Sequence, residues 1–290
     1  MKDEYRFYFG LLPISFTWAV LIPLPPPLFR ALPLSSVATH VAAVSMQERR
    51  CSGAVCAGVN YNGDFLTTAT FLVAGMLSGD GRCKTLDAAA DGYLRGEAVI
   101  SLLLKPRREG GAARVIILGS AVNQDGRSSS LTAPNGPAQQ AVMRAALRAA
   151  ALSGGEVGAL QMHGTGTPLG DPIEAGAAHA ALLSVPGAPL AIGAAKSAVG
   201  HSEAPSGLVG LLQLSMMLVE GASAPILHLR TLSPHVVPRS ELLRHRGAAV
   251  PRQPAALPAA SRSAAAAAGA VSAFAFQGEK TKRRKGLRGG

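Results

Sequence analysis

The chain has 290 residues, of which 48% are hydrophobic and only 4% aromatic, and its formal net charge is +11. This length and apolar content suit one large folded domain or two modest ones and exclude a disordered chain. The three cysteines, Cys51, Cys56 and Cys83, have neither an even count nor a metal-ligand spacing. They therefore indicate a reducing compartment, without a disulfide framework or a bound metal.

Residues 1–36 form an apolar, proline-rich leader. Six prolines interrupt the apolar run over residues 7–34, whereas a membrane-spanning helix needs about 20 apolar residues without such breaks. The basic residues Lys2 and Arg6 precede the apolar run, so a signal peptide is one open interpretation. Against it, Asp3 lies between them and no clear small-residue cleavage site follows. We expect a leader outside the folded domain, no membrane partner and a cytoplasmic location, with plastid or membrane targeting by the leader left open.

Strand and helix patterns alternate after the leader. The patterns predict strands over residues 54–59, 98–104, 115–118, 157–162 and 190–194, and helices over residues 37–47, 137–151 and 207–219. The strand over 98–104 is apolar enough to be central in a sheet. The helix over 207–219 is almost wholly apolar but too short to span a bilayer, so we expect it to be buried on all sides. This alternation predicts an α/β layered fold.

One further helix start is predicted at Asp171, with Asp171 as N-cap, Pro172 at the first helical position and Glu174 at the third.

Residues 241–290 are interpreted as a low-complexity Ala/Arg-rich linker and a basic tail, with a short apolar element over 271–276. Residues 279–290 contain six Lys and Arg residues against one acid. Such a tail can contact nucleic acid or an anionic membrane, but a solvated, disordered end is the simpler interpretation. No aromatic residue interleaves the basic ones, so we expect no nucleic-acid partner.

Two histidines each follow a predicted strand. His163 leads into Gly-Thr-Gly-Thr-Pro, and His201 ends Lys-Ser-Ala-Val-Gly-His. Ligands of open α/β sheets collect beyond the carboxyl ends of the strands. Two neutral imidazoles there can donate N–H groups to one enolate or oxyanion. From the residues alone, a second interpretation is equally open: the two histidines are unrelated, and each is hydrogen-bonded to the backbone.

The histidine motifs resemble those of the β-ketoacyl synthases. The first reads HGTGT at residues 163–167 with GDPIE at 170–174, and the second has Lys196-Ser197, Gly200-His201 and Glu203. Four further stretches agree in family order: DGRCK at 80–84, DGYLRGE at 91–97, NQDGR at 123–127 and TAPNGP at 132–137. The last two are typical of modular polyketide synthases. The resemblance extends over about residues 37–234.

This resemblance implies a thiolase-like α-β-α-β-α fold built from two similar halves. Residues 37–106 would be the end of the first half and residues 107–240 the second, so the fold would be incomplete at its amino-terminal half. It also implies polyketide or fatty-acid biosynthesis by decarboxylative Claisen condensation. In that reaction an acyl group held on a cysteine joins a malonyl unit carried on the phosphopantetheine of an acyl carrier protein. By the same resemblance no cofactor is bound, the carrier protein is a partner and the chain forms a homodimer.

The resemblance also assigns roles to single residues. His163 and His201 match the two catalytic histidines, and Lys196 matches the lysine that orders the surroundings of the second one. Phe276 belongs to a stretch that resembles the closing loop, which helps to build the oxyanion hole, although Gln277 departs from the glycine of that loop.

The expected nucleophile is missing. In a gapless register from residues 58–60 back through His40, its position is filled by Leu32, which cannot form a thioester. None of the three cysteines falls there, and Cys83 matches a cysteine that we interpret as packing. Four functions therefore stay open. They are a condensing enzyme, a malonyl decarboxylase, a basic-tailed surface-binding protein, and a catalytically dead remnant or interaction subunit.

Overall fold

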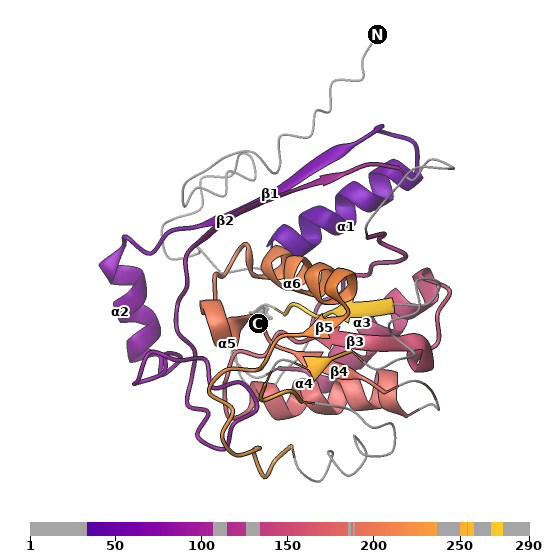
Figure 1. The fold of residues 1–290 in the computed structure, drawn as a ribbon. Coiled ribbons are helices and arrows are strands. Elements are labelled where there is room, and N and C mark those ends of the chain that lie inside the picture. Colours follow the sequence, from indigo (N-terminus) through magenta and orange to yellow (C-terminus); the bar gives the residue numbers. More distant parts are fainter. Residues whose placement is uncertain are drawn as a thin grey trace, which may run out of the picture.

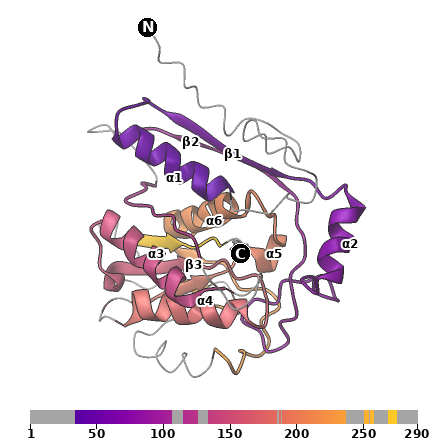
Figure 2. The same cartoon turned by 180° about the vertical axis from the view of Figure 1, so that it is seen from behind.

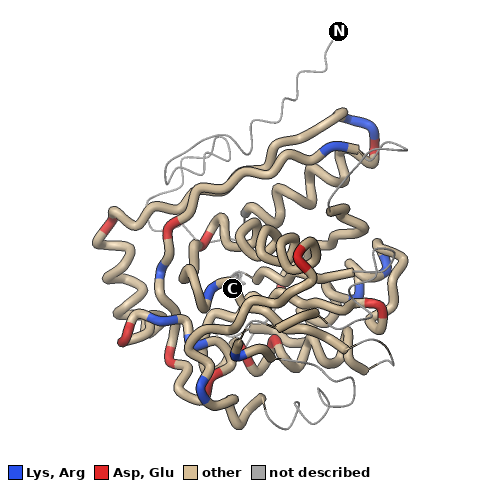
Figure 3. The backbone as a smooth tube through the Cα atoms, viewed as in Figure 1, with Lys and Arg blue, Asp and Glu red and all other residues tan. Residues whose placement is uncertain are grey.

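The computed structural model describes residues 34–106, 115–125, 134–184, 187, 189–236, 250–253, 255–257 and 268–274. The leader, including Leu32, and the tail, including Phe276, lie outside the described residues. Within them, no helix is long and apolar enough to cross a membrane. Figure 3 shows that the described charged residues lie mainly in loops and near the ends of helices and strands.

The amino-terminal part is a helix packed along two antiparallel strands. Helix α1 (Leu34–Gln47) lies against β1 (Ala54–Asn60), which pairs with β2 (Ala98–Leu104) (Figure 1). The predicted helix over 37–47 and both predicted strands are confirmed. However, β2 is not central among the described residues, because it pairs only with β1. Its side chains alternate between partly buried and exposed, and Val99 is 82% exposed.

A helix that the sequence pattern did not predict lies between these strands in the chain. Helix α2 (Phe65–Val73) begins at Asp64, whose carboxylate accepts the N–H groups of Leu66 and Thr67. None of its residues is buried, and it stands at the side of the molecule (Figures 1 and 2). Its sequence, FLTTATFLV, mixes apolar residues with three threonines and has no charged face, so no amphipathic pattern marks it as a surface helix.

The carboxy-terminal part is a parallel sheet of order β4-β3-β7, between helices. Its strands are β3 (Val157–Gln161), β4 (Ala191–Gly193) and β7 (Ala268–Val271), and all five residues of β3 are buried. One face packs on α4 (Gly170–Ala178) and its π-helical continuation η3 (His179–Leu183), beside α3 (Gly136–Ala149). The other face packs on α6 (Ser206–Glu220).

The shorter elements are η2 (Gly154–Glu156), α5 (Lys196–Val199), and the paired strands β5 (Ala222–Ser223) and β6 (Ala255–Ala256).

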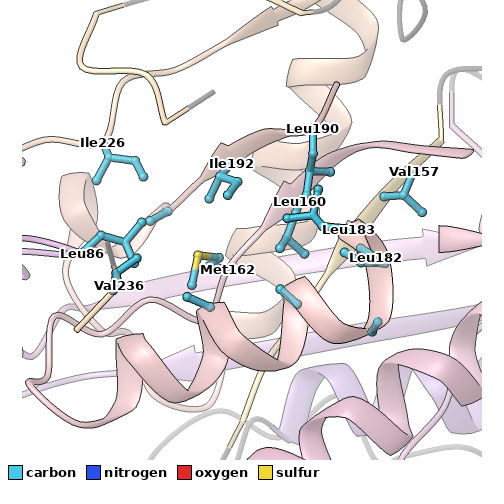
Figure 4. Packing of buried hydrophobic residues seen from close by; sticks show 14 of the residues in the cluster. Leu86, Val157, Leu160, Met162, Leu182, Leu183, Leu190, Ile192, Ile226 and Val236 are labelled. Carbon is cyan, nitrogen blue, oxygen red and sulfur yellow. The ribbon is translucent and has the colours of Figure 1, made fainter. Parts of the chain in front are cut away.

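The two parts stack in layers. Figures 1 and 2 show the β1–β2 pair, then α1 and α6, then the parallel sheet, then α3 and α4. This is the predicted layered α/β arrangement, apart from the outer helical layer beyond β1 and β2, which is not among the described residues. The main core cluster lies between the parallel sheet and α4, where Leu160 is 1% and Leu182 2% exposed (Figure 4).

Three further sequence predictions are wrong in detail. Residues 115–118 form no strand, and Leu118 is 52% exposed. Helix α6 is not buried on all sides. It buries Leu208, Leu214 and Met217 but exposes Leu212, Met216 and Val219, which share one stripe because they are spaced i, i+4 and i+7.

The third concerns residues 241–290, which are not linker and tail throughout. Strand β7 pairs in parallel with β3, and β6 pairs with β5. The small residues that suggested low complexity allow close packing instead, since a Cβ atom on Gly269 would lie 2.6 Å from Leu214 Cδ1. A short alanine-rich strand therefore completes the sheet.

Candidate active site

The loop that carries His163 is held by a carboxylate of α4. The chain leaves β3 at Gln161, and Glu174 Oε1 accepts the N–H of His163 at 2.7 Å while its Oε2 accepts the N–H of Gly164 at 2.9 Å. Ser272, just after β7, donates its hydroxyl to Glu174 Oε1 at 2.5 Å. Glu174 is 3% exposed, so a buried acid fixes the backbone on which His163 stands.

Asp171 does not cap the helix as predicted. Helix α4 begins at Gly170 without a side-chain cap, and the Asp171 carboxylate accepts the N–H of Leu86 at 2.8 Å and of Gly166 at 3.1 Å. Burial raises the pKa of Asp171 to about 7, against the effect of these N–H donors and with a contribution from the nearby Glu174. Asp171 thereby ties the HGTGT loop to a loop of the amino-terminal part, a use that a local cap pattern cannot reveal.

His201 is held by backbone pairing with the amino-terminal part. Its N–H donates to the carbonyl of Leu94 at 2.7 Å, and its carbonyl accepts the N–H of Gly96 at 2.9 Å. The residue is 7% exposed and lies between α5 and α6. Strand β4 leads directly into Lys196 at the start of α5, so both histidine loops follow carboxyl ends of adjacent parallel strands.

The two imidazoles meet. Their ring centroids are 5.3 Å apart at an interplanar angle of 89°, so the shared placement expected from the sequence is what the structure has. Tyr93 and Phe274 pack edge-on against them, Tyr93 5.0 Å from the His201 ring and Phe274 5.8 Å from the His163 ring. The site is therefore aromatic-walled and mostly shielded from water.

Backbone hydrogen bonds fix the protonation of both rings. The N–H of Phe274 donates to His163 Nδ1 at 3.3 Å, and the N–H of Glu203 donates to His201 Nδ1 at 3.0 Å. A ring nitrogen that accepts carries no proton, so each neutral ring holds its proton on Nε2. Burial, followed by the charge of Lys196, lowers the pKa of both histidines well below the ordinary value. Both rings are therefore neutral near pH 7, with one N–H donor each.

Lys196 lies beside the first histidine, and its charge acts on both rings. Its Nζ is 3.3 Å from His163 Nδ1, and its charge also lowers the pKa of His201. The role that the resemblance gives it, to order the surroundings of His201, stays a prediction. Lys196 is 5% exposed, and burial lowers its pKa to about 8, partly offset by the charge of Glu174. The lysine is thus largely charged at pH 7 and places a cation next to the histidine pair.

The nucleophile position and the closing loop are not placed. Leu32 and Phe276 lie outside the described residues. Helix α1, which begins soon after position 32, does reach the site, because Ser35 donates its hydroxyl to the carbonyl of Ala204 at 2.7 Å, shortly after His201.

Of the cysteines, only Cys83 is near the histidines. Its Sγ accepts the N–H of Leu94 at 3.2 Å, next to the backbone of His201, and the residue is 2% exposed. Burial raises the pKa of its thiol, which makes it a poor nucleophile. Cys56 is buried in β1, and burial raises its thiol pKa too. Within the described residues, no group of His, Cys, Asp and Glu could hold a metal ion.

Several residues of the site had no predicted role in it. Ser272 belongs to the short apolar element over 271–276, yet it bonds Glu174. Phe274 begins the stretch that resembles the closing loop, but its backbone bond to His163 has no signal in the sequence. Glu174, Arg95 and Glu203 stand in the quoted motifs, but only Glu174 has a predicted use there, at a helix start. Glu174 and Glu203 share their motifs with the two histidines, which is the available signal, whereas the motif of Arg95 contains no histidine.

Comparison with known proteins identifies the family. The model described as "Beta-ketoacyl synthase, N-terminal domain" matches residues 35–110, and "Beta-ketoacyl synthase, C-terminal domain" matches residues 114–230. The chain belongs to the β-ketoacyl synthase family, as a ketosynthase domain of the kind found in modular polyketide synthases. Its family is one of condensing acyltransferases.

Similar proteins are large synthases. The chain is 40% identical over 206 residues to erythronolide synthase EryA2 of Saccharopolyspora erythraea, covering 70% of this chain and 6% of that protein. It is 43% identical over 209 residues to the mycoketide-CoA synthase of Mycobacterium tuberculosis, covering 70% of this chain and 5% of that protein.

Solved ketosynthases share the fold, which is therefore thiolase-like. The oxazolomycin ketosynthase domain OzmH KS7 of Streptomyces albus JA3453 superposes with a TM-score of 0.72 at 31% identity, covering 78% of this chain and 39% of that one. The ketosynthase from module 6 of the bacillaene synthase of Bacillus subtilis 168 gives a TM-score of 0.68 at 30% identity, covering 70% and 38%. The chain thus spans about two fifths of a solved ketosynthase domain.

Proposed function

We propose that this chain is a ketosynthase-derived domain that binds a malonyl thioester and promotes its decarboxylation, without the acyl transfer that precedes condensation. The observation that carries the proposal is the pair of fixed tautomers. His163 and His201 both accept a backbone N–H at Nδ1, so both present an Nε2–H donor in one shielded site. Two preorganised donors are what a developing enolate oxygen requires.

The step balances without a nucleophile. The bond between the malonyl carboxylate and C2 breaks, carbon dioxide leaves, and the electron pair moves to the thioester as an enolate. The two Nε2–H groups stabilise the enolate oxygen, and the cation of Lys196 beside His163 favours the negative charge. C2 then takes a proton from water, which gives an acetyl thioester. His163, His201 and Lys196 thus act on the oxygen rather than on an acyl-enzyme.

Condensation needs a cysteine nucleophile in the site. In the gapless register Leu32 takes its position, and Cys83 has a thiol pKa that burial raises, so we expect no acyl-enzyme on this chain. The substrate in this proposal is carried on the phosphopantetheine of an acyl carrier protein, which is then the partner, and the domain works as a homodimer in the cytoplasm. The domain division at residues 106 and 240 belongs to the same proposal, extended by β6 and β7.

The experiment uses malonyl carrier protein and the full chain, with carbon dioxide and acetyl carrier protein measured by mass spectrometry. His163→Ala and His201→Ala should each lower the rate by roughly 10²–10³-fold, the usual cost of one oxyanion donor. His235→Ala, which changes an exposed histidine, is the matched control and should leave the rate unchanged. Incubation with an acyl thioester should give no covalent adduct in the intact mass.

A second candidate function is a non-catalytic interaction subunit. It is favoured by the apolar side chains that β1, β2 and α6 expose, among them Val99, Leu103 and Met216. Equal rates for the wild-type chain and both histidine variants would leave this function and reject decarboxylation.

A further inference from the structure

We propose that Arg95 is a positioning residue for His201, acting through Glu203, so that the Arg95–Glu203 ion pair sets which nitrogen of His201 carries the proton. The inference deepens the proposed function, on which its effect on rate rests. The geometry itself is independent of that function, because it concerns only how the chain holds one imidazole.

The first step is the backbone of Glu203. Its N–H donates to His201 Nδ1 at 3.0 Å, a bond between residues two apart in the chain. To make it, Glu203 adopts a φ of 54°, in the left-handed region that a residue with a Cβ enters at a cost of about 1–2 kcal/mol. A conformation of this kind persists only where its surroundings hold it. Something must therefore hold Glu203.

The second step is the partner that holds it. Arg95 Nε lies 2.6 Å from Glu203 Oε1, and the two side chains are 8% and 10% exposed. In so little water, a charge-assisted hydrogen bond is short and strong. The backbone of Arg95 also forms an isolated parallel bridge with His201, flanked by the hydrogen bonds of Leu94 and Gly96. One arginine thus fixes both the backbone of His201 and the residue that bonds its ring.

The third step is the anchor of the arginine. Its Nη1 donates to Thr68 Oγ1 at 2.6 Å, and its guanidinium carbon lies 5.4 Å from the centroid of the Phe71 ring. Both residues belong to α2, which buries none of its own residues. The guanidinium is therefore held between α2 and Glu203, while the backbone bridge to His201 holds the main chain of the same residue. Its fork geometry suits that use better than a lysine would.

The consequence concerns the tautomer. Without the ion pair, the Glu203 backbone is free to leave φ near +54°, and its N–H leaves Nδ1. Nδ1 then competes with Nε2 for the single proton of the neutral ring, so the Nε2–H donor is present for only part of the time. A purely structural ion pair would change stability but not the proton position.

The test reads the His201 tautomer directly, by ¹⁵N NMR of the full chain labelled at histidine, with His201 assigned through His201→Ala. The wild-type chain should show Nδ1 unprotonated and Nε2 protonated. Arg95→Met and Glu203→Ala should each give a mixture of tautomers at His201 and leave His163 unchanged. Alanine keeps a Cβ atom, so Glu203→Ala removes the carboxylate that holds the residue while its φ near +54° stays unfavourable.

Two variants serve as controls. Glu203→Gln keeps an oxygen that can accept from Arg95 and should keep the single tautomer. Arg50→Met breaks the exposed Arg50–Glu48 pair and should change nothing at His201. In the malonyl assay, Arg95→Met and Glu203→Ala should lower the rate about tenfold or more, in the range seen when an orienting partner is lost.

A single Nε2–H tautomer in folded Arg95→Met or Glu203→Ala overturns the proposal, whatever the rates are. If Arg95→Met does not fold, Glu203→Ala alone decides. If the wild-type chain releases no carbon dioxide but the tautomer responds to both variants, the decarboxylase function fails and the positioning role stands.

Discussion

The β1–β2 pair and the β4-β3-β7 sheet are built from equally apolar strands but end in different surroundings. Every residue of β3 is buried, whereas β2 alternates and leaves Val99 82% and Leu103 60% exposed. The difference lies in the neighbouring layers, because helices cover both faces of the parallel sheet and only one face of the β1–β2 pair. The apolar content of a strand therefore indicates that other layers can pack on it. It does not tell how many layers actually cover it in the described part of the chain.

The site depends on the well-covered half but is completed by the other. Both histidines follow strands of the parallel sheet, while Leu94, Arg95 and Gly96 of the amino-terminal part hold His201. The Asp171 carboxylate makes a similar link on the His163 side. The junction between the two parts is thus as important for the site as either part alone.

The largest expected effect is a loss of stability in the parallel sheet, which distinguishes its packing from that of the β1–β2 pair. Leu160→Ala should lower the free energy of unfolding by about 2–5 kcal/mol, because Leu160 is 1% exposed and its loss leaves a cavity in the main core. Urea denaturation at a fixed pH measures it. A loss below 1 kcal/mol would mean that the parallel sheet is no better packed than the β1–β2 pair, which would remove the contrast between them.

The second prediction concerns the junction. Gly166→Ala should cost about 1–3 kcal/mol, because Gly166 has a φ of 80° and a Cβ atom there would lie 2.7 Å from the backbone nitrogen of Lys84. Gly79→Ala is the matched control, since nothing lies within 4 Å of its Cβ position and it should be neutral. Equal urea midpoints for the two variants would show that the parts do not approach so closely.

Local pattern and motif order predicted a good part of the molecule. They predicted the strand β3, the helix α1 and the meeting of the two histidine loops. They failed where a long-range contact decides. The local pattern predicts that Asp171 caps a helix, but its carboxylate accepts the N–H of Leu86. The alanine-rich composition predicts a linker where β7 pairs with β3 at the edge of the sheet. The tautomers of His163 and His201 depend on N–H groups that no residue pattern encodes.

The third prediction concerns two buried aspartates, Asp171 and Asp87, each of which connects the amino-terminal and carboxy-terminal parts by hydrogen bonds. Their pKa values are shifted in opposite directions. Burial raises the pKa of Asp171 to about 7, so the folded state binds a proton that the unfolded state has lost above about pH 4. Its contribution to stability is present at low pH and is lost as pH rises from about 4 to 7. Asp171→Asn should reduce the decrease in the free energy of unfolding over this pH range, by up to about 1.4 kcal/mol per pH unit.

Asp87 provides the contrast. Burial tends to raise its pKa, but the N–H groups of Ala89, Thr231 and Arg230 outweigh burial and lower it. Its contribution is therefore present above the ordinary aspartate pKa and is lost as pH falls through the lowered value. Asp87→Asn should change the stability profile only in acid, below about pH 4. Urea midpoints across pH 3–8 compare the two variants, and identical profiles would contradict the opposite shifts.

The smallest expected effect lies on the exposed face of β2. Val99→Thr should change the free energy of unfolding by less than about 0.5 kcal/mol, because Val99 is 82% exposed and threonine keeps the β-branched shape that strands favour. Ile100→Thr is the matched control, since its side chain lies on the opposite, partly buried face and its hydroxyl would lose contact with water. It should cost more than Val99→Thr.

Protein concentration sharpens this comparison. If Val99→Thr costs as much as Ile100→Thr, and does so only at high protein concentration, then a second copy of the chain covers this face in solution. A cost that does not depend on concentration would instead place the covering layer within the same chain. A negligible cost at every concentration leaves the face open to water, and the β1–β2 pair then holds its place through α1 and the junction alone.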